Sequence, residues 1–217
     1  MSIKVGLRFI EKWGESLEKQ VLRYEAENAP TGQIVFYGPS DFTRWSSHYG
    51  IKPLREVLLG KSGQPCAINR GFGSSCAEHQ LYYYPRMVRP LAPSVLVYVT
   101  MGNMAAFGYT PEETWALEER VLTYTRTDFP DCKLFVLGPN PRKTNTKERL
   151  AAASAHNALA RAFAKASPHC VFFDPYEYTP LLDESLFIED GVHFNQRGYD
   201  VYTAFFQNIL KDELAKF

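Results

Sequence analysis

The chain has 217 residues, 45% of them hydrophobic, and its 24 basic and 24 acidic side chains leave no formal net charge. This length favours one domain over residues 1–217 with a sizeable core, and the charge balance argues against a nucleic-acid partner or a membrane-surface patch. No apolar run reaches the length of a membrane span, and the charged N-terminus does not resemble a secretory signal. The four cysteines form no C-x-x-C pair. They favour reduced thiols in a cytoplasmic protein without a structural zinc site.

Short apolar runs predict five strands, preceded by an extra helix at about residues 7–28. The runs are rich in β-branched or aromatic residues and are continuous rather than alternating, which is typical of parallel strands covered on both faces. In chain order they are 33–38 (QIVFYG), 66–71 (CAINRG), 94–100 (SVLVYVT), 132–138 (CKLFVLG) and 170–174 (CVFFD).

Helical patterns lie between the later strands. Thr110, Pro111 and Glu113 predict a capped start for a helix over 110–128, because Thr and Glu at this spacing form a capping box. Its apolar face consists of Leu117, Val121 and Leu122. An Ala-rich helix is expected over 146–166, with core contacts at Leu150, Leu159 and Phe163.

A last amphipathic helix is expected over residues 196–214. It has a wide apolar stripe formed by Tyr202, Phe205, Phe206, Ile209 and Leu210. The alternation of strands and helices predicts an α/β fold, a three-layer α/β/α sandwich with about five mostly parallel strands.

Polar residues and glycines follow the predicted strands, where parallel sheets place their sites. Ser40 follows the first strand, Gly71 and Gly73 close the second, and Asn103 follows the third. Singly, each has an ordinary structural explanation, since Ser caps helices and Asn and Gly favour turns. The glycine pair makes a poor dinucleotide motif, because Cys76 stands where G-x-G-x-x-G needs its third glycine.

Together with Asp190 and His193 these residues supply the parts of an acyl-transfer site. Such a site needs a nucleophile, a base, a carboxylate that fixes the base's tautomer, and donors for the oxyanion. Ser40 is the candidate nucleophile, His193 the base and Asp190 the carboxylate. The backbone N–H groups of Ser40 and of the Gly73–Ser74 turn, with the amide of Asn103, are candidate donors. The structural alternative is a turn in which Asp190 caps the loop and His193 lies at the surface.

Three segments resemble blocks of the SGNH (GDSL-type) hydrolases: IVFYGPSDFTRW, INRGFGSS and EDGVHFNQRGY. The resemblance covers roughly residues 33 to 210. It implies a flavodoxin-like sandwich and ester hydrolysis without a metal or other cofactor. The family's nucleophile maps to Ser40, and its acid and base map to Asp190 and His193.

The blocks depart from the family pattern at three places. Pro39 replaces the Asp of G-D-S, and Ser74 stands where the second-block Gly is expected. In the third block, an alignment without a gap places Gly102 at the family's Asn position, whereas a shift by one residue places Asn103 there. Both alignments remain open at this stage.

The sequence therefore predicts a serine esterase that cleaves a small acyl ester, with an acetylated carbohydrate as one candidate substrate. Arg44, Trp45 and Arg70 are candidate substrate contacts because they lie near the predicted strand ends. The alternatives are an inactive or weakly active binding protein on the same fold and an acyltransferase that uses the same serine. The sequence leaves the oligomeric state open.

The only local basic cluster, Arg142, Lys143, Lys147 and Arg149, follows the fourth predicted strand and borders the predicted cleft. It has two interpretations, a contact for an anionic group or a solvated loop, and the second is the commoner case.

Overall fold

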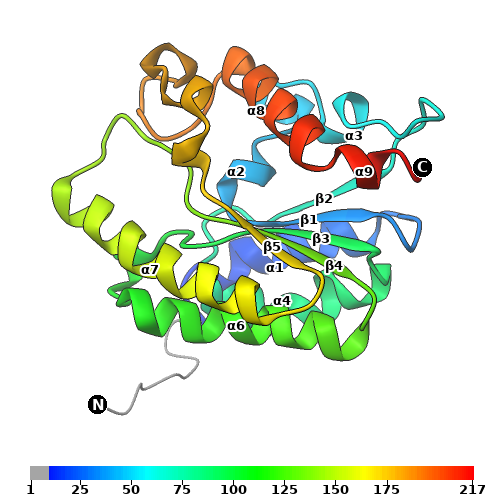
Figure 1. The fold of residues 1–217 in the computed structure, drawn as a ribbon, viewed down its shortest axis with the longest axis horizontal. Coiled ribbons are helices and arrows are strands. Elements are labelled where there is room, and N and C mark those ends of the chain that lie inside the picture. Colours follow the sequence, from blue (N-terminus) through cyan, green and yellow to red (C-terminus); the bar gives the residue numbers. More distant parts are fainter. Residues whose placement is uncertain (1–9) are drawn as a thin grey trace.

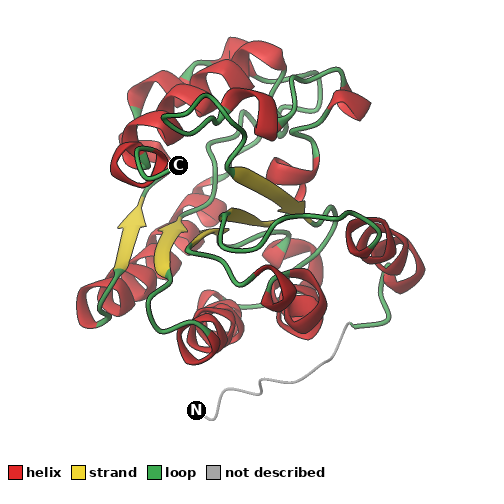
Figure 2. Ribbon diagram, turned by 90° about the vertical axis from the view of Figure 1, so that its right-hand side faces the viewer, coloured by secondary structure: helices red, strands yellow, loops and turns green. Residues whose placement is uncertain are grey.

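The computed structural model describes residues 10–217, in which one parallel sheet of five strands lies between two layers of helices (Figures 1 and 2). The strand order is β2-β1-β3-β4-β5. The second strand of the chain therefore lies on one side of β1, and the three later strands lie on the other side. The strands are β1 (Ile34–Gly38), β2 (Ala67–Gly71), β3 (Val95–Val99), β4 (Lys133–Leu137) and β5 (Cys170–Phe173). The predicted fold class is confirmed, and every predicted strand forms at its expected place.

The two central strands explain the continuous apolar runs. Every residue of β1 and β3 is buried, because helices cover both faces of the sheet. Their register pairs Ile34 with Val95 and Tyr37 with Tyr98, so both strands end at the same level. The loops that follow β1 and β3 are therefore neighbours at the carboxyl edge, as the sequence predicts.

One helical layer packs below the sheet in Figure 1 and the other packs above it. The lower layer consists of α1 (Gly14–Glu25), α4 (Ala77–Met87), α6 (Pro111–Asp128) and α7 (Lys147–Ala166). The upper layer consists of α2 (Ser40–Thr43), α3 (Leu54–Val57), α8 (Gln196–Ile209) and α9 (Lys211–Leu214). The shorter elements are α5 (Met104–Phe107), η1 (Ser47–Tyr49), η2 (Arg89–Leu91), η3 (Pro175–Glu177), η4 (Thr179–Leu182) and η5 (Glu184–Leu186).

The helix boundaries largely follow the sequence signals. Thr110 and Glu113 form the predicted reciprocal capping bonds at the start of α6. The predicted last helix ends at Ile209 and restarts as α9, and α4 was not predicted because Pro85 and consecutive tyrosines interrupt its pattern. The predicted N-terminal helix is shorter, Gly14–Glu25, and residues 7–9 of the prediction lie outside the described residues.

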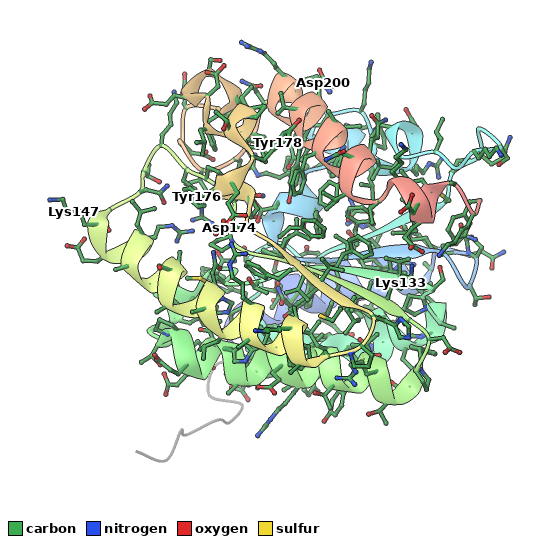
Figure 3. All side chains as sticks on the ribbon, viewed as in Figure 1. Lys133, Lys147, Asp174, Tyr176, Tyr178 and Asp200 are labelled. Carbon is green, nitrogen blue, oxygen red and sulfur yellow. The ribbon has the colours of Figure 1, made fainter. Side chains whose placement is uncertain are left out.

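One predicted core contact is wrong. Leu150 is 43% exposed because it lies in the first turn of α7, which extends past the sheet (Figure 3). Leu159 and Phe163, further along the same helix, pack against the core as predicted.

An aromatic cluster joins the last helix to the turn after β1. The ring of Trp45 stacks on Tyr202 with their centroids 5.5 Å apart, and it also contacts Tyr199 and Phe206. Trp45 is 1% exposed, so this contact is part of the core rather than of the surface. The cluster ties the C-terminal segment directly to the segment that carries Ser40.

Candidate active site

Ser40 is the first residue of α2, directly beyond the end of β1. Pro39 separates it from the strand and cannot continue the strand's hydrogen bonds, since proline has no backbone N–H. In this position the backbone N–H of Ser40 belongs to the first helical turn, where it has no partner within the helix. Both the hydroxyl and the N–H of Ser40 are thus available at the carboxyl edge of the sheet.

The second block supports the nucleophile turn from below. The Asn69 side chain donates to the carbonyl of Phe42 at 2.7 Å, and its oxygen accepts from the N–H of Gly71 at 2.7 Å. A Cβ at Gly71 would lie 2.1 Å from the backbone nitrogen of Thr43, so only glycine fits this position. The end of β2 and the backbone of α2 therefore approach each other closely at Gly71.

Asp190 and His193 lie in a tight turn before α8. The turn is closed by the hydrogen bond from the Ile188 N–H to the His193 carbonyl, 2.9 Å, and by Gly191, whose φ of 64° is in the left-handed region that glycine readily adopts. Asp190 Oδ1 accepts from the N–H of Val192 at 2.8 Å and of His193 at 2.9 Å. The turn therefore holds the carboxylate beside the imidazole.

The three side chains form a continuous hydrogen-bonded chain. Asp190 Oδ2 lies 2.7 Å from His193 Nδ1, and His193 Nε2 lies 2.9 Å from Ser40 Oγ. Because an ionised carboxylate only accepts, the proton of the imidazole is on Nδ1, and Nε2 accepts from the serine hydroxyl. This is the arrangement that allows an imidazole to take a proton from serine.

The carboxylate of Asp190 stays ionised in this environment. Partial burial opposes its charge, but hydrogen bonds from the His193 side chain and from the backbone N–H groups of His193 and Val192 outweigh burial and lower its pKa to about 2. Asp190 is therefore negative over the whole physiological pH range.

The other candidate oxyanion donors lie on the loops after β2 and β3. The N–H of Gly73 donates to the Gln20 side chain at 2.9 Å, so it is already committed. Ser74 has a φ of 65°, and among residues 10–217 no hydrogen bond occupies its N–H or that of Ser40. The Asn103 amide donates to the carbonyl of Ser75 at 2.8 Å, which links the third block to the second.

Gly102 allows the loop after β3 to pack closely against Pro39 because it has no side chain. A Cβ at this position would lie 2.7 Å from the ring of Pro39, so the loop after β3 packs directly against the residue before the nucleophile.

A buried acid behind the third block was missed by the sequence prediction. Glu118 of α6 is fully buried, accepts from the N–H of Met101 at 2.6 Å, and contacts His156 Nε2 at 2.5 Å. Within an amphipathic helix pattern Glu118 looks like any surface acid, so the sequence carries no signal for this role.

Two of the three residues expected to contact the substrate are buried and contact other parts of the protein instead. Trp45 is part of the core, and Arg70, 3% exposed, forms an ion pair with Glu27 at 2.7 Å. Neither is free to contact a substrate beside Ser40, so this part of the prediction is corrected. Arg44 is half-buried and lies over the ring of Tyr49, 4.9 Å from its centroid.

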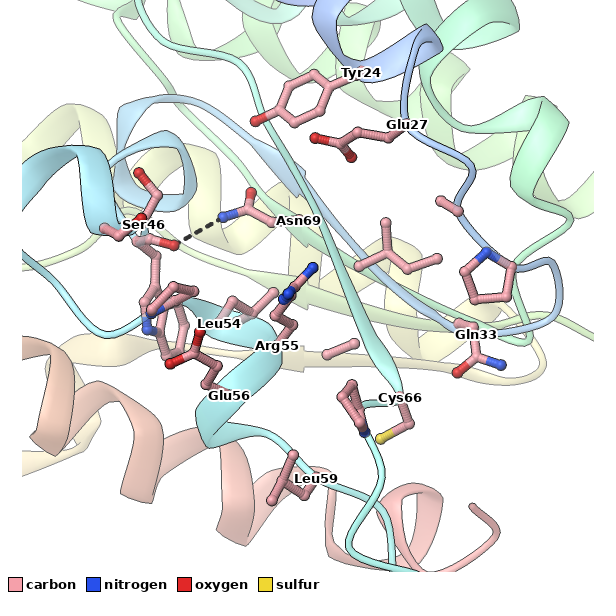
Figure 4. A pocket seen from close by; sticks show the side chains of 18 of the residues that line it. Tyr24, Glu27, Gln33, Ser46, Leu54, Arg55, Glu56, Leu59, Cys66 and Asn69 are labelled. Carbon is pink, nitrogen blue, oxygen red and sulfur yellow. Dashed lines mark hydrogen bonds between the residues drawn. The ribbon is translucent and has the colours of Figure 1, made fainter.

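A hollow of about 1020 Å³ lies apart from the triad, along the outer edge of β2 (Figure 4). Tyr24 and Glu27 line one side of it, and Leu54, Arg55 and Leu59 line the other. None of Ser40, Asp190 and His193 lines it.

Over residues 10–217 no three His, Cys, Asp or Glu side chains come together in a group able to hold a metal ion. No helix in that range has both the length and the apolar composition that crossing a membrane requires.

Comparison with known proteins places the fold. No family model matches the sequence, and no curated protein matches it. Among solved structures, a protein of Streptococcus pneumonia named after platelet activating factor is 19% identical, with a TM-score of 0.72 over 96% of this chain and 97% of that one. A GDSL-like lipase from Bacteroides thetaiotaomicron is 18% identical, with a TM-score of 0.69 over 91% and 98%. A carbohydrate esterase family 3 structure from Talaromyces cellulolyticus is 13% identical, with a TM-score of 0.61 over 85% and 98%.

Proposed function

We propose that this chain, which has the fold of the GDSL-like lipases and acylhydrolases, is a serine esterase that hydrolyses a small acyl ester. The observation that carries the proposal is the unbroken chain from Asp190 through His193 to Ser40, with distances of 2.7 and 2.9 Å. Residues 153 positions apart come within hydrogen-bonding distance at the edge of the sheet where such folds place their sites.

In this reaction Ser40 Oγ attacks the ester carbonyl while His193 Nε2 takes its proton. The bond from the carbonyl carbon to the leaving oxygen then breaks, and His193 gives the proton to the departing alcohol. Water repeats the sequence on the acyl-serine, which releases the acid and restores Ser40. Asp190 holds the imidazole in the required tautomer and stabilises its charged form, without itself becoming protonated.

The negative charge on the carbonyl oxygen needs donors in fixed positions. The backbone N–H groups of Ser40 and Ser74 are candidates because no hydrogen bond within residues 10–217 occupies them. Asn103 is the third, since its bond to the Ser75 carbonyl uses one amide hydrogen and leaves the other. Gly73 is not a donor in this assignment, because Gln20 binds its N–H.

The acyl group is expected to be small, and an acetylated carbohydrate stays a candidate substrate. One structural neighbour is a carbohydrate esterase and another is an acetyl-xylooligosaccharide esterase from Geobacillus stearmophilus. The formed triad supports activity over a role in binding alone. Transfer of the acyl group to an alcohol instead of water would use the same residues and would appear as a new ester in product analysis.

A fluorophosphonate probe tests the proposal. It should label Ser40 in the folded protein and should not label protein that was heat-denatured before the probe was added. Ser47→Ala is a matched control, because Ser47 is an exposed serine seven residues further on. Labelling at Ser74 or Ser75 would contradict the assignment, and so would failure of the folded protein to hydrolyse p-nitrophenyl acetate.

A further inference from the structure

Two arginines without a carboxylate partner lie on the loop after β4 and on the first turn of α7. Both side chains, Arg142 and Arg149, are half-buried. Across residues 10–217 neither forms an ion pair, although five other arginines pair with Asp or Glu: Arg70, Arg86, Arg89, Arg161 and Arg197. Among residues 10–217, Arg44 and Arg126 are also half-buried and form no ion pair. What sets Arg142 and Arg149 apart is a common partner, Asn145, which donates to the Arg142 carbonyl and accepts from Arg149 Nε.

The loop that carries Arg142 is bound to both halves of the triad region. Asn140 donates to the Asp41 carboxylate at 2.9 Å, next to the nucleophile. The N–H of Lys143 donates to the carbonyl of Gly191 at 2.8 Å, next to Asp190. These two bonds fix the loop between the nucleophile turn and the acid–base turn.

Asn145 joins the segments that carry the two arginines to the hydroxyl of Tyr176. Asn145 donates to the Tyr176 oxygen at 2.6 Å, and Arg149 Nε donates to Asn145 Oδ1 at 3.2 Å. No acceptor for the Tyr176 O–H or for the terminal nitrogens of Arg149 occurs within residues 10–217. Tyr176 itself lies in the gap between the start of α7 and the upper layer (Figure 3).

The directions of the pKa shifts of Arg149 and Tyr176 agree with this arrangement. Burial lowers the pKa of Arg149 and the positive charge of Arg142 lowers it further, whereas Tyr176 and Asp41 oppose the shift. Burial raises the pKa of Tyr176, and both arginines counteract that rise. Asp41 faces Arg149 but is bound by Asn140 and forms no ion pair with it.

Two half-buried like charges destabilise each other unless an anion lies between them. The planar guanidinium matches carboxylate and phosphate groups, and a phenolic O–H adds a third donor. We propose that Arg142, Arg149 and Tyr176 form a subsite for an anionic group, a carboxylate or a phosphate, on the alcohol part of the ester. The inference rests on the proposed esterase function. It assigns the alcohol part because the loop is bonded to the turn of His193, which protonates the leaving oxygen.

The test compares an ester that is charged on its alcohol part with a neutral counterpart. Para-carboxyphenyl acetate carries a carboxylate on its alcohol part, and its methyl ester is the neutral counterpart. We expect kcat/KM for the anionic ester to exceed that for the neutral one by about tenfold or more, since hydrogen bonds to a charged group are the strong ones. Para-acetoxyphenyl phosphate distinguishes phosphate from carboxylate as the better group.

Substitutions locate the effect. In Arg142→Gln and Arg149→Gln the ratio of kcat/KM between anionic and neutral esters should fall toward one, and in Tyr176→Phe it should fall by a smaller amount. Arg120→Gln removes the same charge from an exposed position on α6 and should leave the ratio unchanged. A ratio that falls equally in Arg120→Gln would show a general charge effect and overturn the subsite.

A binding measurement keeps the inference independent of catalysis. Calorimetry on the Ser40→Ala variant should show para-hydroxybenzoate binding more tightly than its methyl ester, and Arg149→Gln should abolish the difference.

Hydrolysis of neutral esters with no preference for the anion would overturn the subsite but not the esterase. Anion binding without hydrolysis of any ester would overturn the esterase but not the subsite. A preference for p-nitrophenyl hydrogen succinate over its methyl ester, without one for para-carboxyphenyl acetate, would contradict placement on the alcohol part.

Discussion

The carboxylate of Glu118 accepts a hydrogen bond from the backbone N–H of Met101, 2.6 Å away, two residues before Asn103. Met101 and Asn103 have φ angles of 58° and 56°, in the left-handed region that non-glycine residues rarely adopt. The other carboxylate oxygen contacts His156, which like Glu118 is fully buried. A buried acid from α6 thus helps to hold the loop that presents the proposed oxyanion donor.

We therefore predict that Glu118→Ala lowers kcat with little change in KM, because Glu118 positions the loop and does not touch the substrate. It should also lower the free energy of unfolding by roughly 3 kcal/mol, since the Met101 N–H and the His156 ring lose their partner. Glu118→Gln should recover much of kcat. Glu119→Ala, at an exposed neighbouring position, should behave as the parent, and an equal kcat in Glu118→Ala would remove the positioning role.

Replacement of the nucleophile is expected to be severe. Ser40→Ala should lower kcat on p-nitrophenyl acetate by on the order of 10⁴-fold or more, since the three residues act as a unit. The thermal midpoint should change little, because Ser40 is only half-buried. Ser47→Ala provides the control, and residual activity near the parent level would transfer the role to another serine.

Asp190 links the site to stability at low pH. Its pKa in the folded protein is about 2, against an ordinary value of 3.8, so the ionised form favours folding. This stabilisation is complete above about pH 4 and is lost as the pH falls toward 2. Urea unfolding between pH 2 and 5 should show a steeper loss of stability for the parent than for Asp190→Asn. Parallel profiles would contradict the ionised hydrogen-bonded carboxylate.

The same substitution should also remove most of the activity at neutral pH. An Asn amide can donate to His193 Nδ1 and so favours the tautomer whose Nε2 carries a proton, which cannot accept from Ser40. A loss on the order of 10⁴-fold in kcat is expected, as in other triads.

Asn103 decides how the oxyanion is stabilised. If its amide is a donor, Asn103→Ala should lower kcat by about 10²–10³-fold with little change in KM. Asn103→Asp keeps the size but lacks the donor, so it should be equally impaired. A variant as active as the parent would leave only the backbone N–H groups of Ser40 and Ser74 in the site.

Gly71 tests the support under the nucleophile turn. In Gly71→Ala the new Cβ would overlap the Thr43 backbone, so α2 must move and activity should fall with stability. Gly14→Ala, where a Cβ meets no atom within 4 Å, is the matched control. An unchanged thermal midpoint for Gly71→Ala would contradict the close approach.

The sheet and the pairing of Asp190 with His193 could be predicted from the sequence because both depend on local signals. Continuous apolar runs define β1 and β3, which are buried on both faces, and Asp190 and His193 lie in one short turn. The burial of Trp45 and Arg70 could not be predicted, because each contacts a residue distant in the sequence. Trp45 stacks on Tyr202, and Arg70 forms an ion pair with Glu27. Glu118 was missed for the same reason, because its partner Met101 lies on another element.

The stacking of Trp45 on Tyr202 has a consequence for how this protein is made. The ribosome releases the N-terminal part first, so the sheet's first strands and the nucleophile turn emerge long before α8. Until α8 docks, the Trp45 ring lacks its contacts with Tyr199, Tyr202 and Phe206, and His193 has no fixed position relative to Ser40. A nascent chain, or one shortened before α8, should therefore hold its serine unactivated, and activity should arise only when α8 packs over the nucleophile turn.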